Sequence, residues 1–344
     1  MSTVSWPDPE RRQAFLHWLQ QLPPGLGLRG DSLAPASADA SFRRYLRLDS
    51  AQGPLIVMDA PPPQEDVRPF VHVAALLKQA GLHVPRILAQ DVNRGFLLLE
   101  DLGTKLYLKA LQCADEAQAR TLMHDATQAL VRMQRHADAS SLPPFDEALL
   151  QRELDLFPEW CVQREFGITW TAAQEQQWHS LCRLLLDSAL AQPTVFVHRD
   201  WMPRNLMIAE PNPGVLDFQD AVRGPVSYDI ACQLRDAFHS WDEAFELDVA
   251  VRWWQAAREA ALPVGDDFGE VWRQIEWMGM QRHLKVAGIF CRLKHRDGKP
   301  AYAKDLPRFF NYLTKVAMRY RPLRGLLPLI EPLSGRALQA GYTF

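Results

Sequence analysis

Four polar side chains near the middle of this 344-residue chain have the types and the spacing that chemistry requires. His198, Asp200 and Asn205 share one short segment, His-Arg-Asp-Trp-Met-Pro-Arg-Asn, and Asp217 follows twelve residues after Asn205. A short apolar run precedes each of the two groups, so we expect two strands that present these side chains at turns. Asp and Asn favour turns on their own account, but the complete string is far more specific than any one of its members.

This set of residues suits the transfer of a phosphoryl group, a reaction that asks for little covalent chemistry from a protein. It requires a carboxylate that accepts the proton of the acceptor hydroxyl, and oxygen ligands that hold Mg²⁺ against the phosphates. Asp200 is our candidate for the base, and Asn205 and Asp217 are our candidates for the metal ligands. We expect His198 to brace the loop and not to react.

The elements that must position these residues follow from the apolar pattern. Helical spacing occurs over 10–22 and 66–80, and short apolar runs that predict strands occur at 33–37, 42–48, 55–58, 86–90 and 96–99. After residue 103 the pattern is mostly helical, except for the stretch 195–217. We therefore expect an α+β fold with a small β-rich N-lobe that binds nucleotide, residues 1–102, and a large helical C-lobe, residues 103–344.

Composition excludes several classes of protein. The net charge of −3 provides no basic footprint for nucleic acid. The five cysteines are scattered without a Cys-x-x-Cys pair, which argues against a metal cage or a disulfide framework. No apolar run is long enough to span a bilayer. We expect a soluble, cytoplasmic monomer that binds neither nucleic acid nor membrane.

The catalytic string and the segment Gly-Pro-Val-Ser-Tyr-Asp-Ile-Ala at 224–231 resemble the aminoglycoside phosphotransferase and choline kinase-like superfamily, relatives of protein kinases. The resemblance extends from about residue 33 to about residue 321. It implies a protein-kinase-like fold with two lobes, ATP as the phosphoryl donor, and Asp229 as a support of the catalytic loop. Asp229 also suits the N-cap of a helix, and both roles can hold at once.

Two other kinds of protein share parts of this pattern. Protein kinases also carry His-Arg-Asp, but the twelve residues from Asp217 to Asp229 leave no room for a long activation loop, and no Gly-rich lid is present. A nucleotide-binding pseudokinase remains a second alternative, because the third predicted strand, Leu-Ile-Val-Met-Asp at 55–59, lacks the Lys that the superfamily usually places there. The intact Asp200, Asn205 and Asp217 argue against that alternative.

The missing Lys raises the question of which residue binds the phosphates. Strand alternation puts Arg44 on one face with Leu46 and Leu48. We expect Arg44 to reach the phosphates in place of the Lys, with help from Ser41 and from backbone amides of the turn. A solvated strand arginine is the alternative.

The strand at 96–99 runs into Glu-Asp-Leu at 100–102, and this stretch resembles the hinge between the lobes of a kinase. The resemblance implies that the backbone of the hinge binds adenine. Glu100 and Leu102 are therefore further candidates for ATP binding.

A subset of the superfamily is more similar, namely the bacterial anomeric kinases for N-acetylmuramate and N-acetylglucosamine. The resemblance is carried by the catalytic string and by Asp-Ala-Ser-Phe-Arg-Arg-Tyr at 39–45, Val-Met-Asp-Ala-Pro-Pro at 57–62 and Arg-Asp-Gly-Lys-Pro-Ala-Tyr at 296–302. It implies phosphorylation of the sugar at C1 with ATP, in peptidoglycan recycling. A kinase of another small hydroxylated molecule, of the aminoglycoside, choline or homoserine type, is the alternative.

An excess of positive charge near the C-terminus favours an anionic acceptor. Residues 270–321 contain twelve Lys or Arg and four acids, and on a helix with about 100° per residue several of these cations share one face. Arg282, Lys285 and Arg292 are the candidates on that face for the lactyl carboxylate of N-acetylmuramate, and Arg204 is the next candidate. A solvated basic face is the alternative. Trp201 is a candidate for stacking on the sugar, or for packing beneath the loop.

Overall fold

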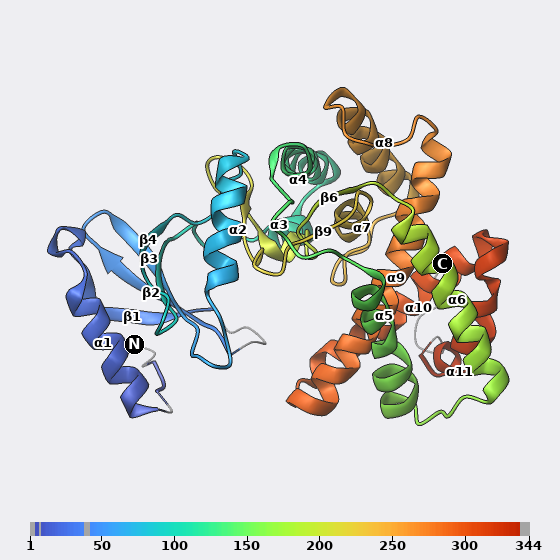
Figure 1. Ribbon diagram of the computed structural model, residues 1–344, viewed down its shortest axis with the longest axis horizontal. Helices are drawn as coiled ribbons and strands as arrows, with labels where there is room; N and C mark the ends of the chain where they lie inside the picture. Colours follow the sequence, from blue (N-terminus) through green and yellow to red (C-terminus); the bar gives the residue numbers. More distant parts are fainter. Residues whose placement is uncertain (1–3, 7, 38–41, 338–344) are drawn as a thin grey trace. The chain divides into compact units, whose positions relative to one another are not determined.

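The computed structural model describes residues 4–6, 8–37 and 42–337 (Figure 1). The chain divides into two compact units: Met1–Tyr107 together with Asn205–Asp220, and Leu108–Arg204 together with Ala221–Phe344. The segment Asn205–Asp220 thus belongs with the N-terminal residues, although it follows them by almost a hundred positions. The expected division at residues 102 and 103 did not include this segment.

The first unit contains a five-stranded antiparallel sheet with the strand order β1-β2-β3-β5-β4. The strands are β1 (Arg29–Ser37), β2 (Arg44–Ser50), β3 (Gly53–Asp59), β4 (Ile87–Asp91) and β5 (Phe96–Glu100). Helix α1 (Pro9–Gln21) precedes the sheet, and helix α2 (Arg68–Gln79) connects β3 to β4. The order of strands and helices is the one that the apolar pattern predicted.

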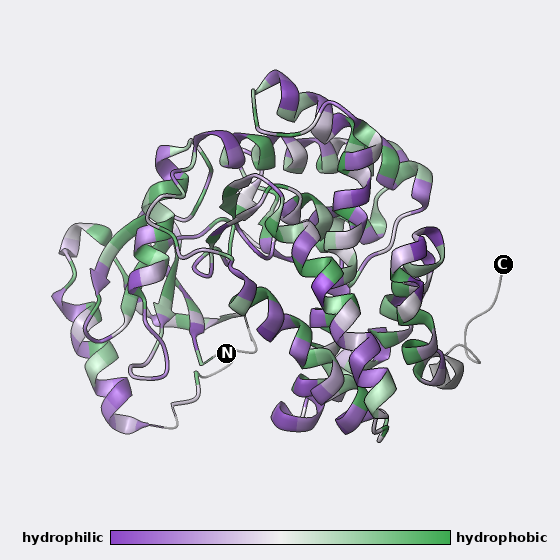
Figure 2. Cartoon of the chain, turned by 45° about the vertical axis from the view of Figure 1, so that its right-hand side comes forward, coloured by the Kyte–Doolittle hydropathy of each residue, from purple (hydrophilic) through white to green (hydrophobic). Residues whose placement is uncertain are grey.

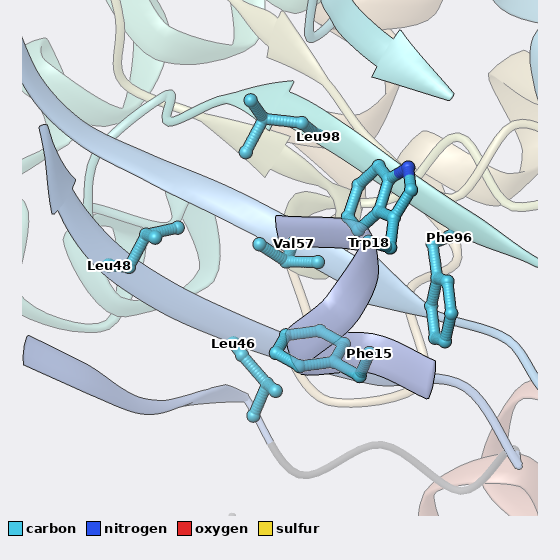
Figure 3. Packing of buried hydrophobic residues seen from close by; sticks show 7 residues of the cluster. All are labelled: Phe15, Trp18, Leu46, Leu48, Val57, Phe96 and Leu98. Carbon is cyan, nitrogen blue, oxygen red and sulfur yellow. The ribbon is translucent and has the colours of Figure 1, made fainter. Parts of the chain in front are cut away.

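One face of this sheet packs against α1 (Figure 3). Because successive side chains of a strand alternate between faces, every second residue of β2, β3 and β5 contributes to the contact. The ring of Trp18 stacks on that of Phe96 with centroids 5.4 Å apart. The buried hydrophobic cluster at this contact consists of Phe15, Trp18, Leu46, Leu48, Val57, Phe96 and Leu98.

The opposite face of the sheet carries Met58, Leu97 and Leu99, which are also buried. In Figure 1 the sheet lies between α1 and α2. Helix α2 contacts the segment 205–220 through Phe70, whose ring centroid lies 4.6 Å from that of Phe218. Figure 2 shows hydrophobic residues concentrated on the strands and alternating with hydrophilic ones along the helices.

Two pairs of very short strands lie close in the sequence to the predicted catalytic residues. In the first unit, β7 (Leu206–Met207) pairs with β8 (Gly214–Val215). In the second unit, β6 (Thr194–Val197) pairs with β9 (Val222–Pro225). The sequence predicted a β-like stretch here, and the structure divides it between two small antiparallel pairs.

The second unit is otherwise helical. Its helices are α3 (Tyr107–Cys113), α4 (Glu116–His136), α5 (Glu147–Leu156), α6 (Ala172–Leu190), α7 (Tyr228–Leu234), α8 (Glu243–Glu259), α9 (Phe268–Asp297), α10 (Leu306–Arg319) and α11 (Leu327–Ala337), and a π-helical segment at Phe157–Glu165 continues α5.

Helix α9 forms the centre of the second unit, and most of its residues are buried. At Gly288 it approaches the end of α5 so closely that an added Cβ would lie 2.4 Å from the carbonyl oxygen of Leu156. Only glycine permits this approach, which brings the buried side chains of α9 next to those of α5.

Within the described ranges, no helix combines the length and the apolar character that crossing a membrane requires.

Candidate active site

The loop that follows β6 is held in place by a buried carboxylate. Asp229, in the first turn of α7, accepts hydrogen bonds from the backbone N–H groups of His198 at 2.7 Å and Arg199 at 3.0 Å. Burial raises the pKa of Asp229 to about 7, against the opposing effect of these two hydrogen bonds. The N-cap position of α7 is occupied by Ser227, so the contacts of Asp229 are those of a loop support.

His198 is nearly buried, and its Nδ1 accepts a hydrogen bond from the backbone N–H of Asp200 at 3.2 Å. The ring therefore braces the loop from within. The supporting role expected for His198 in catalysis stays a prediction.

Backbone strain occurs at two positions of the candidate site. Arg199 has φ 75° and Asp217 has φ 62°, both in the left-handed region that side chains other than glycine rarely occupy. Such a residue costs about 1–3 kcal/mol and persists where its surroundings hold it. Asp217 is itself a predicted metal ligand, and Arg199 directly precedes the predicted base.

Asp200 combines partial exposure with a strongly charged environment. Its side chain is 35% exposed, so a substrate hydroxyl can reach it, and Arg282 Nη1 lies 3.2 Å from Oδ1. Desolvation by the surrounding protein acts to raise the pKa of Asp200. The positive charges of Arg282 and Lys285 outweigh this effect and hold the pKa at about 2. Asp200 is therefore ionised at neutral pH, as a proton acceptor must be.

Glu153 of α5 connects the loop to α9. Its carboxylate receives Arg199 Nη2 at 2.5 Å and Lys285 Nζ at 2.8 Å. Burial acts to raise the pKa of Glu153, but the charges of Lys285 and Arg199 outweigh it and lower that pKa. The sequence reasoning missed Glu153, because nothing in the local pattern of α5 distinguishes it from other helical acids.

The cations predicted to share one face of α9 differ in their burial and in their ion pairs. Arg282 and Lys285 are buried, with exposures of 2% and 6%, and pair with carboxylates inside the protein. Burial, and then the charge of Arg296, lower the pKa of the half-buried Arg292. Arg296 is exposed and pairs with Asp297. The face is therefore neither a single solvated surface nor a row of unpaired cations, and contact of these residues with a sugar stays a prediction.

Trp201 lies beneath the catalytic loop. Its side chain is completely buried, and its Nε1 donates to Gln233 Oε1 at 3.1 Å. Stacking on a sugar is not compatible with this burial, so of the two expected roles the structure supports packing under the loop.

Arg204 lies at the end of the same loop, one residue before Asn205. Its guanidinium lies 5.3 Å from the centroid of the Phe238 ring, and its Nη1 donates to the Tyr302 hydroxyl at 3.5 Å. Aromatic neighbours of this kind also suit the apolar face of a sugar ring.

The β7–β8 hairpin brings the two predicted metal ligands together, because Asn205 immediately precedes β7 and Asp217 lies two residues after the end of β8. The backbone N–H of Leu216 donates to the carbonyl of Asn205 at 2.9 Å. Asn205 Nδ2 lies 3.4 Å from Asp217 Oδ2. Gln219, which lies two residues after Asp217 and was not among the predicted site residues, donates to Asp217 Oδ1 at 3.1 Å.

Oxygen donors of this kind fit Mg²⁺, which keeps several waters and takes one or two protein ligands besides substrate phosphates. No group of three or more His, Cys, Asp or Glu in the described part of the chain could hold a metal ion by itself. The Asn205–Asp217 pair thus fits a metal that is completed by nucleotide phosphates and water.

The predicted hinge begins at Glu100, the last residue of β5, and ion pairs hold two of its residues. Glu100 pairs with Arg86 at 2.9 Å, and Asp101 pairs with Arg47 of β2 at 2.6 Å. Leu102 packs so tightly on Gly214 that an added Cβ there would lie 2.8 Å from Leu102 Cδ1. The hinge and the hairpin that carries the metal ligands are therefore parts of one packed unit.

Arg44 has a partner that the sequence did not indicate. Arg44 and Arg11 both bind the fully buried Asp59, with Arg44 Nε 3.0 Å from Oδ2 and Arg11 Nε 2.9 Å from Oδ1. The guanidinium of Arg44 also lies 4.3 Å from the centroid of the Trp6 ring, on the face of the sheet that α1 covers. A phosphate contact would take Arg44 away from Asp59, and it stays a prediction. Ser41 lies outside the described residues.

Comparisons with known proteins identify the family of this chain. The model of the phosphotransferase enzyme family matches residues 32–264. The N-acetylmuramate/N-acetylglucosamine kinase of Pseudomonas putida is 54% identical over 306 residues, which cover 89% of this chain and 89% of that protein. The protein of the same name from Neisseria meningitidis serogroup B is 45% identical over 338 residues, which cover 97% of this chain and all of that protein.

Among solved structures, the ADP-bound aminoglycoside phosphotransferase APH(2'')-Ib is similar with a TM-score of 0.56, at 13% identity, over 89% of this chain and 97% of that chain. This likeness confirms the expected fold class, an α+β fold of the protein-kinase-like type. The extent of the family match and the identity to relatives of nearly equal length show that this chain belongs to the phosphotransferase enzyme family.

Proposed function

We propose that this protein is an ATP-dependent sugar kinase that phosphorylates the anomeric hydroxyl of N-acetylmuramate and N-acetylglucosamine. The observation that carries the proposal is Asp200, an ionised and accessible carboxylate on a strained loop that Asp229 and Arg282 hold in place. Sequence comparison supports the proposal, because relatives named as kinases of these two sugars are 45–54% identical to this chain.

In the proposed reaction, Asp200 accepts the proton of the C1 hydroxyl. The oxygen of that hydroxyl forms a bond to the γ-phosphorus of ATP, and the bond from this phosphorus to the bridging oxygen of ADP breaks. Because the pKa of Asp200 is about 2, the carboxyl releases the proton to solvent and is ready for the next cycle.

Asn205 and Asp217 are the proposed ligands of Mg²⁺, which neutralises charge on the phosphates when it is bound. The hairpin between these two residues sets their spacing before any ligand arrives. Gln219 holds Asp217 Oδ1 and so restricts the carboxylate to one orientation.

For the nucleotide, we propose that the backbone at Glu100–Leu102 binds adenine. The side chains of Glu100 and Asp101 are occupied by Arg86 and Arg47, and these ion pairs hold the hinge backbone in place. Ser41, predicted from the sequence alone, is the candidate for the phosphates.

For the lactyl carboxylate of N-acetylmuramate, we favour Arg204 among the predicted cations. Arg204 lies four residues after Asp200 on the same loop, and Phe238 and Tyr302 lie beside its guanidinium. Arg282 and Lys285 already pair with Asp200 and Glu153, and Arg292 remains a candidate.

We further propose that the enzyme acts as a cytoplasmic monomer in peptidoglycan recycling. The donor ATP is a cytoplasmic metabolite, and the two sugars are those of the bacterial cell wall. The relatives named as kinases of these two sugars support the choice of substrates on which this proposal rests.

The product of the reaction tests the proposal directly. The protein is incubated with ATP, Mg²⁺ and each member of a panel that contains the two sugars, an aminoglycoside, choline and homoserine. Phosphorus and proton NMR then identify the product, because a phosphate on C1 splits the anomeric proton signal. We expect C1 phosphates of the two sugars. A phosphate on another oxygen, turnover of another member of the panel, or no phosphorylated product would overturn the proposal.

A further inference from the structure

The guanidinium of Arg282, a residue of α9, contacts both the backbone and the side chains of the catalytic loop. The guanidinium Nη1 donates to the carbonyl oxygen of Arg199 at 2.9 Å and lies 3.2 Å from Asp200 Oδ1. Nη2 lies 3.7 Å from the sulfur of Met202. The side chain of Arg282 is only 2% exposed, so these contacts are made inside the protein.

The carbonyl that Arg282 binds belongs to the strained residue of the loop. Arg199 has φ 75°, and its carbonyl oxygen also accepts a hydrogen bond from Cys232 Sγ at 3.4 Å. A residue other than glycine keeps such a conformation only where its surroundings hold it. Because Asp200 follows directly, a change of backbone at Arg199 would displace the Asp200 carboxylate.

The planar fork of an arginine suits this task better than a lysine does. A guanidinium presents several N–H donors in fixed directions, so Nη1 can bind the carbonyl and the carboxylate together while Nη2 lies against the Met202 sulfur. Lys285, three residues further along α9, binds Glu153 at 2.8 Å and the Tyr228 hydroxyl at 3.3 Å instead. Arg282 and Lys285, the two buried cations of α9, therefore form ion pairs with different carboxylates.

A cation beside the base makes that base weaker. This loss of basicity at Asp200 is compatible with phosphoryl transfer, because positioning and charge stabilisation contribute more to that reaction than the strength of the base does. The charged and titratable groups around Asp200 are Arg282 and Lys285 of α9, His198 and Arg199 of the loop, and Asp229 and Cys232 of α7.

We propose that Arg282 is a positioning residue for Asp200, which fixes the catalytic carboxylate equally for either sugar and does not select the acceptor. This inference rests on the proposed function, in which Asp200 accepts the proton of the acceptor hydroxyl. It differs from the prediction made from the sequence, in which Arg282 binds the lactyl carboxylate.

Two substitutions and one control test the proposal. Arg282→Met removes the fork and the charge, and Arg282→Lys keeps the charge without the fork. Arg273→Met removes a half-buried arginine of α9 that pairs with Glu270 and lies over the Trp277 ring. The values of kcat and KM are measured for both sugars and for ATP, with the pH dependence of kcat and unfolding in urea.

For Arg282→Met we expect kcat to fall about a hundredfold, by the same factor on both sugars, with little change in KM for ATP. The acid limb of the kcat profile should move to higher pH, because Asp200 loses its nearest cation. Arg282→Lys should keep the acid limb of the wild type and recover only part of kcat. Arg273→Met should behave as the wild type does.

A loss confined to N-acetylmuramate would show that Arg282 binds the lactyl carboxylate, and an unchanged kcat in Arg282→Met would show that it does not position the base. Either result overturns the proposal. If Arg282→Met does not unfold cooperatively, Arg282→Lys decides, and a wild-type kcat on both sugars in that variant overturns the proposal. A wild-type protein that makes no sugar phosphate contradicts the proposed function itself, which is a different outcome.

Discussion

The carboxylate of Asp229 and the backbone N–H of His198 form a 2.7 Å hydrogen bond that ties the first turn of α7 to the catalytic loop. The carboxylate is fully buried, and burial raises its pKa to about 7. In the unfolded chain the same group has an ordinary pKa near 3.8. The native protein therefore binds this proton more tightly than the unfolded chain does.

The first prediction concerns the pH dependence of stability. A raised pKa in the folded state favours folding at low pH, and this contribution is lost as the pH rises through about 7. The free energy of unfolding of the wild type should therefore decline between about pH 4 and 7, in part because of Asp229. We expect this part of the decline to be absent in Asp229→Asn. Urea unfolding at pH 5 and pH 8 measures the difference. An identical pH dependence in both proteins would show that Asp229 ionises normally.

The second prediction concerns Glu153, the buried carboxylate between Arg199 and Lys285. Glu153→Gln leaves the buried Lys285 and the partly buried Arg199 without their counter-charge, and we expect a loss of about 3–5 kcal/mol in the free energy of unfolding. Glu147→Gln is the matched control, because Glu147 lies on the same helix and makes an exposed ion pair with Arg183. Equal, small effects of both substitutions would contradict the network.

The third prediction concerns the metal pair. Asp217→Ala should lose turnover and the Mg²⁺-dependent part of nucleotide affinity, because the uncharged amide of Asn205 would be the one protein ligand left for Mg²⁺. Titration of nucleotide binding with and without Mg²⁺ measures this effect, and Asp49→Asn, a change at an exposed acid of β2, is the control. An unchanged Mg²⁺ titration in Asp217→Ala, or wild-type activity in the presence of chelator, would exclude the pair as a metal site.

The fourth prediction separates the two roles of Arg44. Since Arg44 binds the buried Asp59, we expect Arg44→Met to lower the free energy of unfolding by about 1–3 kcal/mol and to leave KM for ATP close to that of the wild type. Arg29→Met, which removes an exposed arginine of β1, is the control. Unchanged stability with a raised KM for ATP would instead support the phosphate contact predicted from the sequence.

The sequence predicted the parts of the site that are local in the chain. Asp200, Asn205 and Asp217 lie within eighteen residues, and the strands beside them are visible as short apolar runs. The partners of these residues come from distant helices, and local patterns do not encode such pairings. Glu153 and Arg282 are separated by almost 130 residues, and only the packing of α5 against α9 brings each to the same loop.

The face of β2 shows the same limit. Strand alternation correctly placed Arg44 with Leu46 and Leu48. Alternation states which side chains share a face but not what covers that face, and α1 covers this one. The ion pair of Arg44 with Asp59 followed from that packing and was not predicted.

The most direct test of the account is the turnover of Asp200→Asn. The amide keeps the shape of the carboxylate but cannot accept the proton, and a positioned base contributes about 10²–10⁴ to the rate. The account predicts that kcat on N-acetylglucosamine falls at least about a hundredfold while the dissociation constant for ATP stays that of the wild type. A variant that binds ATP normally and keeps more than about a tenth of the wild-type kcat would contradict it.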